Sequence, residues 1–320
     1  MAGPADVMAV VKADAYGHGV EHVLPVLQES GVRRYAVATV QEGIELRELG
    51  VDGRILVLEA PLPEYLPAYA RHALSVTIPS MELARAAARR AGRGDRLRVH
   101  LNVDTGMGRI GVAPERAGEA LEVLRSAADL TIEGVWSHYA TAGDPGSTVV
   151  RQQFDRFEGV IEALDLDWGS TSTHIANSGA LVSFPDCVSA LPNPVVRVGI
   201  TLYGYPPTMG LEDAHDWKPV MRLSTRILHV KTVEKGTPVS YYHEWTAPRR
   251  TRVATLGAGY ADGYRRILSG RSEVRVAGRR VPVAGTICMD MTMVDLGPPD
   301  GGSSVAIGEE AVLFGPDRKS

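Results

Sequence analysis

Short apolar runs alternate with helical patterns over the first two thirds of the chain. The runs are rich in Val, Ile and Leu, and the segments between them repeat apolar residues at the period of an amphipathic helix. Eight strands that alternate with helices predict a parallel sheet closed into a (β/α)8 barrel. The expected strands are 7–11, 35–38, 55–58, 73–78, 97–103, 130–136, 172–175 and 195–198. The expected helices include 21–29, 41–49, 80–90, 114–127 and 149–164, with Ser80 as an N-cap.

An open, doubly wound parallel sheet is the rival interpretation of this alternation. Such a sheet normally carries a glycine-rich turn after its first strand. Here the first strand is followed by Lys12-Ala-Asp-Ala-Tyr-Gly-His-Gly19, which lacks that spacing of glycines. The barrel is therefore favoured.

The pattern changes near residue 215. Runs rich in β-branched residues follow one another, separated by Gly, Pro and Asp, and no helical period is convincing. These runs are 221–233, 252–256, 272–276, 280–283, 292–296 and 311–314. We expect a barrel over 1–214 and a β-rich domain over 215–320. Because the last expected strand lies close to Ser320, we expect this second domain to be incomplete.

Composition excludes several classes of protein. The 320 residues include 34 Lys and Arg against 38 Asp and Glu, so a net charge of −4 argues against a nucleic-acid partner. No run approaches the roughly 18 apolar residues that indicate a membrane span. The two cysteines, Cys187 and Cys288, form neither a metal-ligand spacing nor a disulfide framework. We therefore expect a cytoplasmic protein without a metal site.

Lys12 is the first residue with chemical significance. It follows the first apolar strand, and in a barrel the carboxyl ends of the strands face the active site. A partly desolvated lysine there can form a Schiff base with a carbonyl group. The alternative is a lysine at the end of a strand that simply extends into water.

The loops after the seventh and eighth strands suit an anion. Barrel enzymes often bind phosphate at this position through loop amides and a helix N-terminus. Asn177 and Ser178 offer side-chain donors, and Gly199 permits close approach of the backbone. A simple helix cap by Asn177 or Ser178 is the alternative. Together with Lys12, a phosphate site here would suit pyridoxal phosphate.

Seven motifs in chain order resemble those of the alanine racemase family, and they span nearly the whole chain. They are Val10-Val-Lys-Ala-Asp-Ala-Tyr-Gly-His-Gly19, Asp104-Thr-Gly-Met-Gly-Arg-Ile-Gly111, Trp136-Ser-His-Tyr-Ala-Thr-Ala142, His174-Ile-Ala-Asn-Ser178, Arg197-Val-Gly-Ile-Thr-Leu-Tyr-Gly204, Gly259-Tyr-Ala-Asp-Gly263 and Cys288-Met-Asp290. The family's architecture, a barrel followed by a β domain, agrees with the pattern of elements. The resemblance implies an isomerase that uses pyridoxal 5'-phosphate and a homodimer that shares its active sites.

The resemblance also implies two catalytic residues. Lys12 would carry the cofactor covalently and would take or return the Cα proton on one face of the amino acid. Tyr260 of the partner subunit would do so on the other face. Racemisation needs one base on each face, and a tyrosine with a pKa near 10 needs a cationic or hydrogen-bonding environment for this work.

Further residues would hold the cofactor. Arg197 would donate to the pyridine nitrogen and leave it unprotonated, which weakens the ring as an electron sink and limits side reactions. His174 would hydrogen-bond Arg197, and His138 would pack against the ring or a cofactor oxygen. For both histidines, a satisfied core residue is the alternative. The remaining cofactor-binding residues would be Tyr16, Asn177, Ser178, Gly199 and Ile200.

Arg109 and the Met289 backbone N–H would contact the substrate carboxylate, and Asp290 would lie near the entrance. Many family members carry a carbamylated lysine seven positions before this arginine, where this chain has Asn102. Since a neutral amide cannot supply the missing negative charge, we expect a chloride ion or a rearranged hydrogen-bond network beside Asn102 and Arg109.

The implied function is interconversion of L-alanine and D-alanine, which supplies D-alanine for cell-wall peptidoglycan. A racemase of broader specificity is one alternative, because pocket size cannot be read from the sequence. A non-catalytic barrel that binds pyridoxal phosphate is the other. Such a carrier would not need Tyr260 or the Met289-Asp290 pair.

Overall fold

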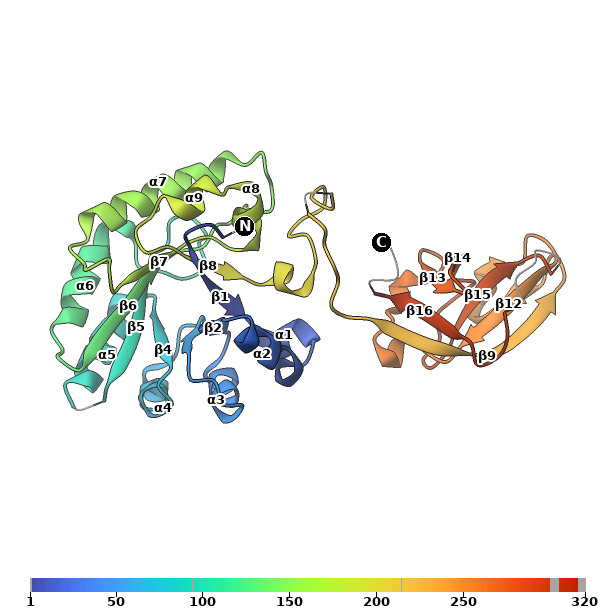
Figure 1. Cartoon of the computed structure of the whole chain (residues 1–320), viewed down its shortest axis with the longest axis horizontal. Helices are drawn as coiled ribbons and strands as arrows, with labels where there is room; N and C mark the ends of the chain where they lie inside the picture. The colour runs from blue at the N-terminus through green and yellow to red at the C-terminus, as the bar shows by residue number, and fades with distance from the viewer. Residues whose placement is uncertain (1, 94, 214, 300–304, 316–320) are drawn as a thin grey trace. The chain divides into compact units, whose positions relative to one another are not determined.

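The computed structural model describes residues 2–93, 95–213, 215–299 and 305–315. The chain forms two compact units, Met1–Trp217 and Lys218–Ser320. Figure 1 shows parallel strands surrounded by helices in the first unit and a β-sheet in the second.

Eight parallel strands form the first unit's sheet, in the order β7-β6-β5-β4-β3-β2-β1-β8. Backbone bonds from Thr173 N to Asn193 O (3.1 Å) and from Arg197 N to Ala176 O (3.0 Å) join the two ends, so the sheet closes. The (β/α)8 barrel is confirmed. The strands are β1 Asp6–Val10, β2 Arg34–Val37, β3 Arg54–Val57, β4 Ser75–Ile78, β5 Leu97–Asn102, β6 Leu130–Trp136, β7 Ser172–His174 and β8 Val195–Val198.

The helices of the first unit lie outside this sheet (Figure 1). Ser80 caps the fifth helix by accepting from Leu83 N at 3.2 Å, as expected. Thr39 and Glu42 form a capping box on the third. The helices are α2 Val20–Glu29, α3 Val40–Glu48, α4 Leu66–Arg71, α5 Met81–Ala91, α6 Ala117–Arg125, α7 Thr148–Ala163, α8 Ser178–Ser183 and α9 Asp186–Ser189, with 3-10 turns η1 Pro63–Tyr65, η2 Pro114–Arg116 and η3 Ile200–Tyr203.

The barrel strands are apolar along most of their length because both faces of a parallel barrel are covered. Ile55, Val76 and Val99, for example, are fully buried. Many polar side chains of these strands are buried with them, among them His100 and Glu133. Such groups need partners, because an unpaired buried charge is costly.

The second unit is antiparallel, with a six-stranded sheet in the order β14-β13-β16-β9-β12-β15. All six expected runs are strands. A two-stranded ribbon, β10 with β11, was not expected, because two residues are too short to show alternation. The strands are β9 Leu223–Val233, β10 Pro238–Val239, β11 Trp245–Thr246, β12 Thr251–Leu256, β13 Glu273–Val276, β14 Arg279–Pro282, β15 Thr292–Gly297 and β16 Glu310–Phe314. Its described helical turns are η4 Tyr241–His243, η5 Tyr260–Asp262 and η6 Arg266–Leu268.

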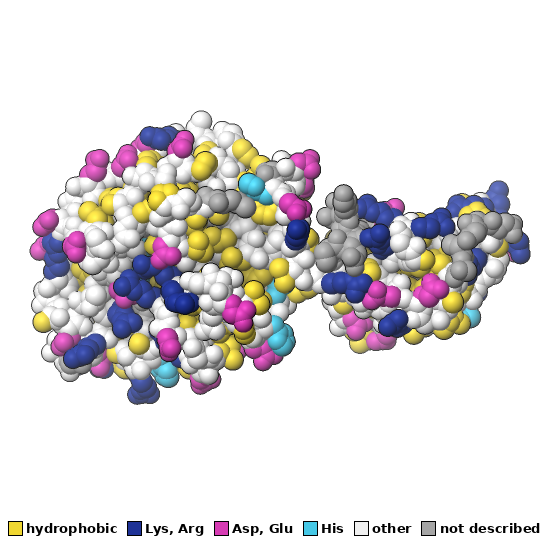
Figure 2. Space-filling view, in the orientation of Figure 1, with side chains coloured by type: hydrophobic (Ala, Val, Ile, Leu, Met, Phe, Trp, Pro, Cys, Tyr) yellow, Lys and Arg dark blue, Asp and Glu magenta, His cyan; other side chains and the backbone are white. Residues whose placement is uncertain are grey.

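Charged side chains of both signs are scattered over the face of the barrel unit drawn in Figure 2. In the part of the chain that the structure describes, no helix combines the length and the apolar character that a membrane crossing requires.

Candidate active site

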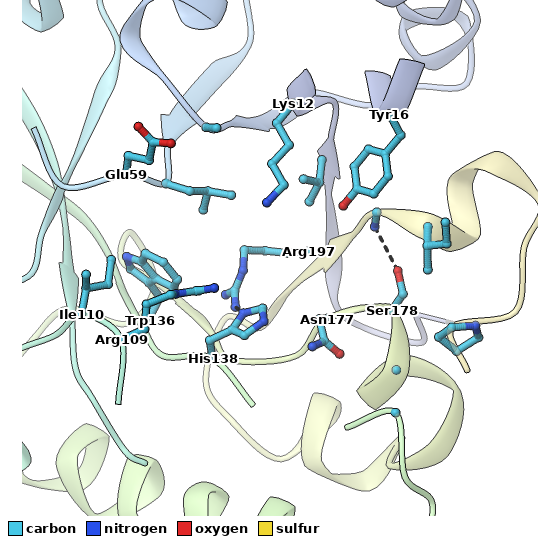
Figure 3. A pocket seen from close by; sticks show the side chains of 18 of the residues that line it. Lys12, Tyr16, Glu59, Arg109, Ile110, Trp136, His138, Asn177, Ser178 and Arg197 are labelled. Atoms are coloured by element: carbon cyan, nitrogen blue, oxygen red, sulfur yellow. Dashed lines mark hydrogen bonds between the residues drawn. The ribbon is translucent and has the colours of Figure 1, made fainter. Parts of the chain in front are cut away.

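A cavity of about 530 Å³ lies within the barrel unit. Lys12, Arg109 and Arg197 extend toward one another in it (Figure 3). The sequence-predicted residues that line it are Lys12, Tyr16, Arg109, His138, Asn177, Ser178, Arg197, Gly199 and Ile200. Loops that follow different barrel strands supply most of these residues, as is typical of the carboxyl end of a barrel.

Lys12 begins α1 (Lys12–Gly17), which is not a right-handed helix. Residues 13 to 16 all adopt the left-handed conformation, with φ between 52° and 58°. This conformation costs about 1–2 kcal/mol per non-glycine residue. Two bonds hold it: Ala13 N donates to Glu42 Oε1 at 2.7 Å, and Val20 N donates to Asp14 Oδ1 at 2.7 Å. Strain held by surrounding structure is typical of functional sites.

The predicted phosphate site is a set of donors around Ser178. Its Oγ accepts from Gly199 N (3.0 Å) and from Thr201 Oγ1 (3.1 Å), so the Ser178 hydroxyl hydrogen stays available. A Cβ at Gly199 would collide with the Tyr16 hydroxyl, so only glycine permits this approach. Asn177 lines the cavity and also caps α8, accepting from Ala180 N at 3.1 Å. The helix cap, which the sequence analysis gave as the alternative for Asn177, is therefore present in the structure.

Arg197 is 3% exposed, and its two Nη atoms are fully engaged. Nη1 donates to His174 Nδ1 (2.7 Å) and His174 O (2.8 Å). Nη2 donates to Ser137 O (2.7 Å), His138 Nδ1 (3.0 Å) and Ile175 O (3.2 Å). Arg197 Nε makes none of the hydrogen bonds among the described residues, which leaves one donor for a ligand. Burial and the Arg109 charge lower the pKa of Arg197 to about 9, so the group stays charged at neutral pH.

Both predicted histidines accept a hydrogen bond from Arg197. In each ring, the nitrogen that faces Arg197 therefore carries no hydrogen. Burial, followed by the charges of Arg197, Arg109 and Lys12, lowers the pKa of His138 to about 3. Burial and Arg197 hold the pKa of His174 well below its usual value. His174 is 1% exposed and lies behind Arg197 rather than in the cavity wall.

Trp136 belongs to the site, although the sequence analysis gave it no role. Its ring lies 4.8 Å from the Arg197 guanidinium carbon and stacks on the His174 ring at 5.8 Å. The residue lines the cavity. A cation above an aromatic face is stabilised when it is shielded from water. Its place directly before the Ser137-His138 pair, at the end of a barrel strand, is the signal that could have identified it.

A second, much smaller cavity of about 10 Å³ lies beside Asn102 and Arg109. Asn102 is buried, and its Nδ2 donates to Trp136 O at 3.3 Å. Its Oδ1 has no hydrogen-bond partner among the described residues. A buried acceptor of this kind needs a donor.

The second unit contributes a separate group of predicted residues. Tyr260 N donates to Cys288 O and Ala261 N donates to Met289 O, both at 3.0 Å. The Met289 N–H has no acceptor among the described residues, and Asp290 is exposed. Tyr260 and Met289 are 45% and 54% exposed.

Tyr241 lies beside this group and was missed by the sequence analysis. Thr286 Oγ1 donates to Tyr241 O at 3.1 Å, and Ser240 Oγ donates to Thr286 O at 2.5 Å. Ser240, Tyr242 and His243 have φ of 69°, 60° and 52°. No sequence motif signalled this turn, since the strain became visible only in the structure.

A barrel that carries a lysine after its first strand, followed by a β unit, defines a class of two-domain barrel enzyme. The model of the alanine racemase N-terminal domain matches residues 1–207, and that of the C-terminal domain matches residues 220–320. The chain therefore belongs to the alanine racemase family and is an isomerase.

Known relatives resemble the chain over nearly its whole length. The alanine racemase of Chlorobaculum tepidum is 43% identical over 98% of this chain and 81% of its own length. The crystal structure of alanine racemase from E. faecalis matches with a TM-score of 0.88 at 33% identity, over 99% of this chain and 83% of the other. A histidine racemase from Leuconostoc mesenteroides matches with a TM-score of 0.85 at 28% identity, over 98% and 83%.

Proposed function

We propose that this chain interconverts L-alanine and D-alanine with pyridoxal 5'-phosphate bound covalently at Lys12, and that it supplies D-alanine for cell-wall peptidoglycan. One observation carries the proposal. Lys12, the free Nε donor of Arg197 and the free hydroxyl hydrogen of Ser178 all belong to residues of one cavity of about 530 Å³. These groups suit the aldehyde, the ring nitrogen and the phosphate of that cofactor.

Each barrel residue then has a defined task. Pyridoxal phosphate, when bound, supplies a conjugated ring that withdraws electrons from the Cα–H bond of the amino acid. Arg197 donates its Nε–H to the ring nitrogen and, being charged, gives that nitrogen no proton. Ser178, Tyr16 and the amides of Gly199 and Ile200 bind the phosphate. The Lys12 amine takes or returns the Cα proton on one face.

The opposite face needs a second proton handler, and among the described residues of the cavity His138 and Tyr16 are poor candidates. His138 accepts from Arg197 and its pKa is about 3, so it is a very weak base. Tyr16 is proposed to bind the phosphate. We therefore assign the second role to a phenol of the second unit from a partner subunit, in a homodimer.

Two phenols compete for that role. The sequence analysis assigns it to Tyr260, which lies in the 3-10 turn η5. Tyr241 is more exposed, at 63%, and is flanked by left-handed residues. Non-glycine residues with positive φ cluster at two described places. One is 13–16 beside Lys12, and the other is Ser240, Tyr242 and His243 around Tyr241. Since strain clusters at catalytic groups, we favour Tyr241 as the proton handler, with Tyr260 as its neighbour in the site.

Exposed apolar side chains on neighbouring turns of the second unit support the dimer. Cys288 O and Met289 O accept hydrogen bonds from the backbone of the Tyr260 turn, and Ser240 Oγ lies 3.6 Å from Cys288 Sγ. The exposed residues on these turns, each at least 44% exposed, are called the Tyr241 patch: Tyr241, Tyr242, Tyr260, Met289 and Met291. Apolar side chains that gather on a surface mark an interaction site. We propose that this Tyr241 patch covers the barrel cavity of the partner subunit.

The substrate carboxylate is proposed to bind Arg109 and the free Met289 N–H, with Asp290 near the entrance. The 10 Å³ cavity beside Asn102 has about the size of one water molecule. It therefore favours a rearranged polar network over chloride, which would need the side chains to move apart. An anomalous-scattering map of crystals grown in bromide decides between them, since only a halide site gives a peak beside Arg109.

Substrate breadth is the remaining alternative. Other amino acids should be tested as substrates, because a protein named as a histidine racemase has a similar fold, with a TM-score of 0.85. Membership of a racemase family argues against the other alternative, a non-catalytic barrel that only binds pyridoxal phosphate. The cytoplasmic location expected from the sequence stays a prediction.

The decisive experiment combines activity with subunit complementation. Purified protein with pyridoxal phosphate and L-alanine should form D-alanine, detected by chiral chromatography. Lys12→Ala and Tyr241→Phe should each lose activity. Dimers that combine both variants, made by co-expression with two affinity tags, should recover about half of the wild-type activity, because one of two shared sites regains both groups. No recovery in the mixed dimers would refute the shared site.

A further inference from the structure

A continuous line of buried polar side chains runs from Arg197 into the barrel interior. His174 Nδ1 lies 2.7 Å from Arg197 Nη1, and His174 Nε2 lies 2.9 Å from His100 Nδ1. His100 Nε2 lies 3.7 Å from Glu133 Oε2. All four side chains are at most 6% exposed.

The hydrogen positions in this line follow from the chemistry of its ends. Arg197 can only donate, so His174 Nδ1 must accept and His174 carries its proton on Nε2. That proton is donated to His100 Nδ1, so His100 carries its own proton on Nε2. The His100 N–H therefore faces the Glu133 carboxylate. Every donor in the line points from Arg197 toward Glu133, and no other neutral arrangement satisfies the contacts.

The barrel is built to accommodate this line. A Cβ at Gly134 would collide with His100 Nδ1, so the absence of a side chain there leaves room for the imidazole. Ser75 Oγ donates to Glu133 Oε2 at 2.5 Å and fixes the carboxylate from a neighbouring strand. Burial alone would raise the pKa of Glu133, but contacts with His100, Ser75 and Arg54 lower it to about 2. The carboxylate is therefore charged.

Two further charges face the Glu133 end of this line. Arg54 Nε and Arg98 Nε lie 3.7 Å and 3.9 Å from Glu133 Oε1, and both side chains are nearly half exposed. Water and salt screen these two arginines. The contacts of Glu133 with His100 and Ser75 are buried, and both use the other carboxylate oxygen, Oε2.

We infer that Glu133 and His100 are positioning residues that lock the tautomer of His174 and, through it, the orientation of Arg197, so that only the Arg197 Nε–H remains for the cofactor. This inference rests on the proposed role of Arg197. Neither residue lines the cavity. They act on the reaction in two ways. They fix the direction of the hydrogen bonds that His174 makes, and the Glu133 carboxylate compensates the buried positive charge of Arg197.

The first test measures the tautomers directly and needs no cofactor. In apoprotein labelled with ¹⁵N-histidine, long-range ¹H–¹⁵N spectra distinguish the two neutral tautomers from the imidazolium. We expect His100 and His174 to be neutral and protonated on Nε2 from pH 6 to 8, with assignments from the single His→Gln variants. An Nδ1–H tautomer or an imidazolium at either position would overturn the inference.

The second test uses Glu133→Gln, which keeps the shape and an acceptor for His100 but removes the charge. We expect kcat to fall on the order of 10-fold with a KM for alanine within about 2-fold, and the absorption band of bound pyridoxal phosphate to shift. Arg98→Gln is the matched control, because Arg98 is nearly half exposed and contacts the other carboxylate oxygen, Oε1, outside the line. Its kcat should stay within about 2-fold of wild type.

Equal kcat in Glu133→Gln and wild type, or an equal loss in Glu133→Gln and Arg98→Gln, would contradict the inference. If Glu133→Gln does not fold, His100→Gln provides the same kinetic comparison, and the wild-type tautomers still decide. A wild-type protein that does not racemise alanine would instead remove the proposed function. These two failures are therefore distinguishable.

Discussion

The two units present their candidate residues in opposite ways. In the barrel, Arg197 and His174 are almost completely buried, and all four Nη–H donors of the arginine are engaged. In the second unit, Tyr241 and Tyr260 are about half exposed or more, and the Met289 N–H is free among the described residues.

This difference indicates a division of labour. The barrel holds its groups by internal hydrogen bonds, so a cofactor cradle exists before any ligand arrives. The second unit presents groups whose bonding capacity is unused, which suits residues that act in the site of a partner subunit. Substitutions in the barrel should therefore affect cofactor binding and chemistry, and those in the Tyr241 patch should affect chemistry at a cofactor that stays bound.

The largest effect is expected for Lys12→Ala. It removes both the covalent attachment point and one proton handler, so D-alanine formation should fall on the order of 10⁴-fold or more. Borohydride treatment with pyridoxal phosphate should no longer attach the cofactor, as mass spectrometry of the intact chain will measure. Lys12→Arg is the matched control, since it keeps the charge and should be equally inactive. Retention of a tenth of the activity by Lys12→Ala would contradict its role.

Tyr241→Phe and Tyr260→Phe sharpen the comparison within the second unit. Removal of the proton-handling phenol should lower kcat on the order of 10²- to 10³-fold and leave the cofactor bound. We expect this loss for Tyr241→Phe and a loss of about 10-fold or less for Tyr260→Phe. Steady-state kinetics with L-alanine and with D-alanine as substrate measures this loss of kcat. The cofactor absorption band shows whether the cofactor stays bound. The reverse order would return the role to Tyr260.

Stability should depend on pH through the barrel histidines. The folded-state pKa of His138 is about 3, below its unfolded value of about 6.5, so the unfolded chain binds more protons between these values. The contribution of neutral His138 to the free energy of unfolding is therefore fully present above pH 6.5 and is lost as the pH falls toward 3. This group contributes up to about 1.4 kcal/mol per pH unit, and buried His174 acts in the same direction.

Urea unfolding of the apoprotein at pH 4.5, 5.5 and 7 measures the slope of the free energy of unfolding against pH. His138→Gln should reduce it by about one proton. If His138→Gln has the wild-type slope, the histidines of the site do not titrate as we expect.

The smallest effect is expected at the phosphate site. Ser178→Ala removes one donor to the phosphate and one acceptor for Gly199 N, so the Kd for pyridoxal phosphate should rise about 10-fold. Equilibrium dialysis of the apoprotein measures it. Thr201→Val removes only a bond to Ser178 and should change the Kd by less than about 3-fold. Equal effects would mean that Ser178 acts through packing alone.

The sequence predicted the barrel well because each strand is a short apolar run next to a strongly periodic helix, as in residues 75–90. It predicted the cavity residues through the family resemblance, and those that it named in the barrel either line the cavity or, like His174, lie directly behind it. It missed β10 and β11, and it missed the strained turn at Tyr241, because two-residue strands and left-handed non-glycine residues have no local signal.

The order of apolar and polar residues along the chain was enough to determine which segments become strands and which lysine follows the first of them. The line of buried polar contacts from Arg197 to Glu133 required the closed barrel, because Arg197 on β8 meets His174 on β7 where the sheet closes. His100 and His174 are 74 positions apart, and their contact exists because β5 and β7 flank β6, where Gly134 leaves room between them. Periodicity reports how a residue relates to its near neighbours, whereas the direction of a buried hydrogen bond depends on which distant groups can only donate or only accept.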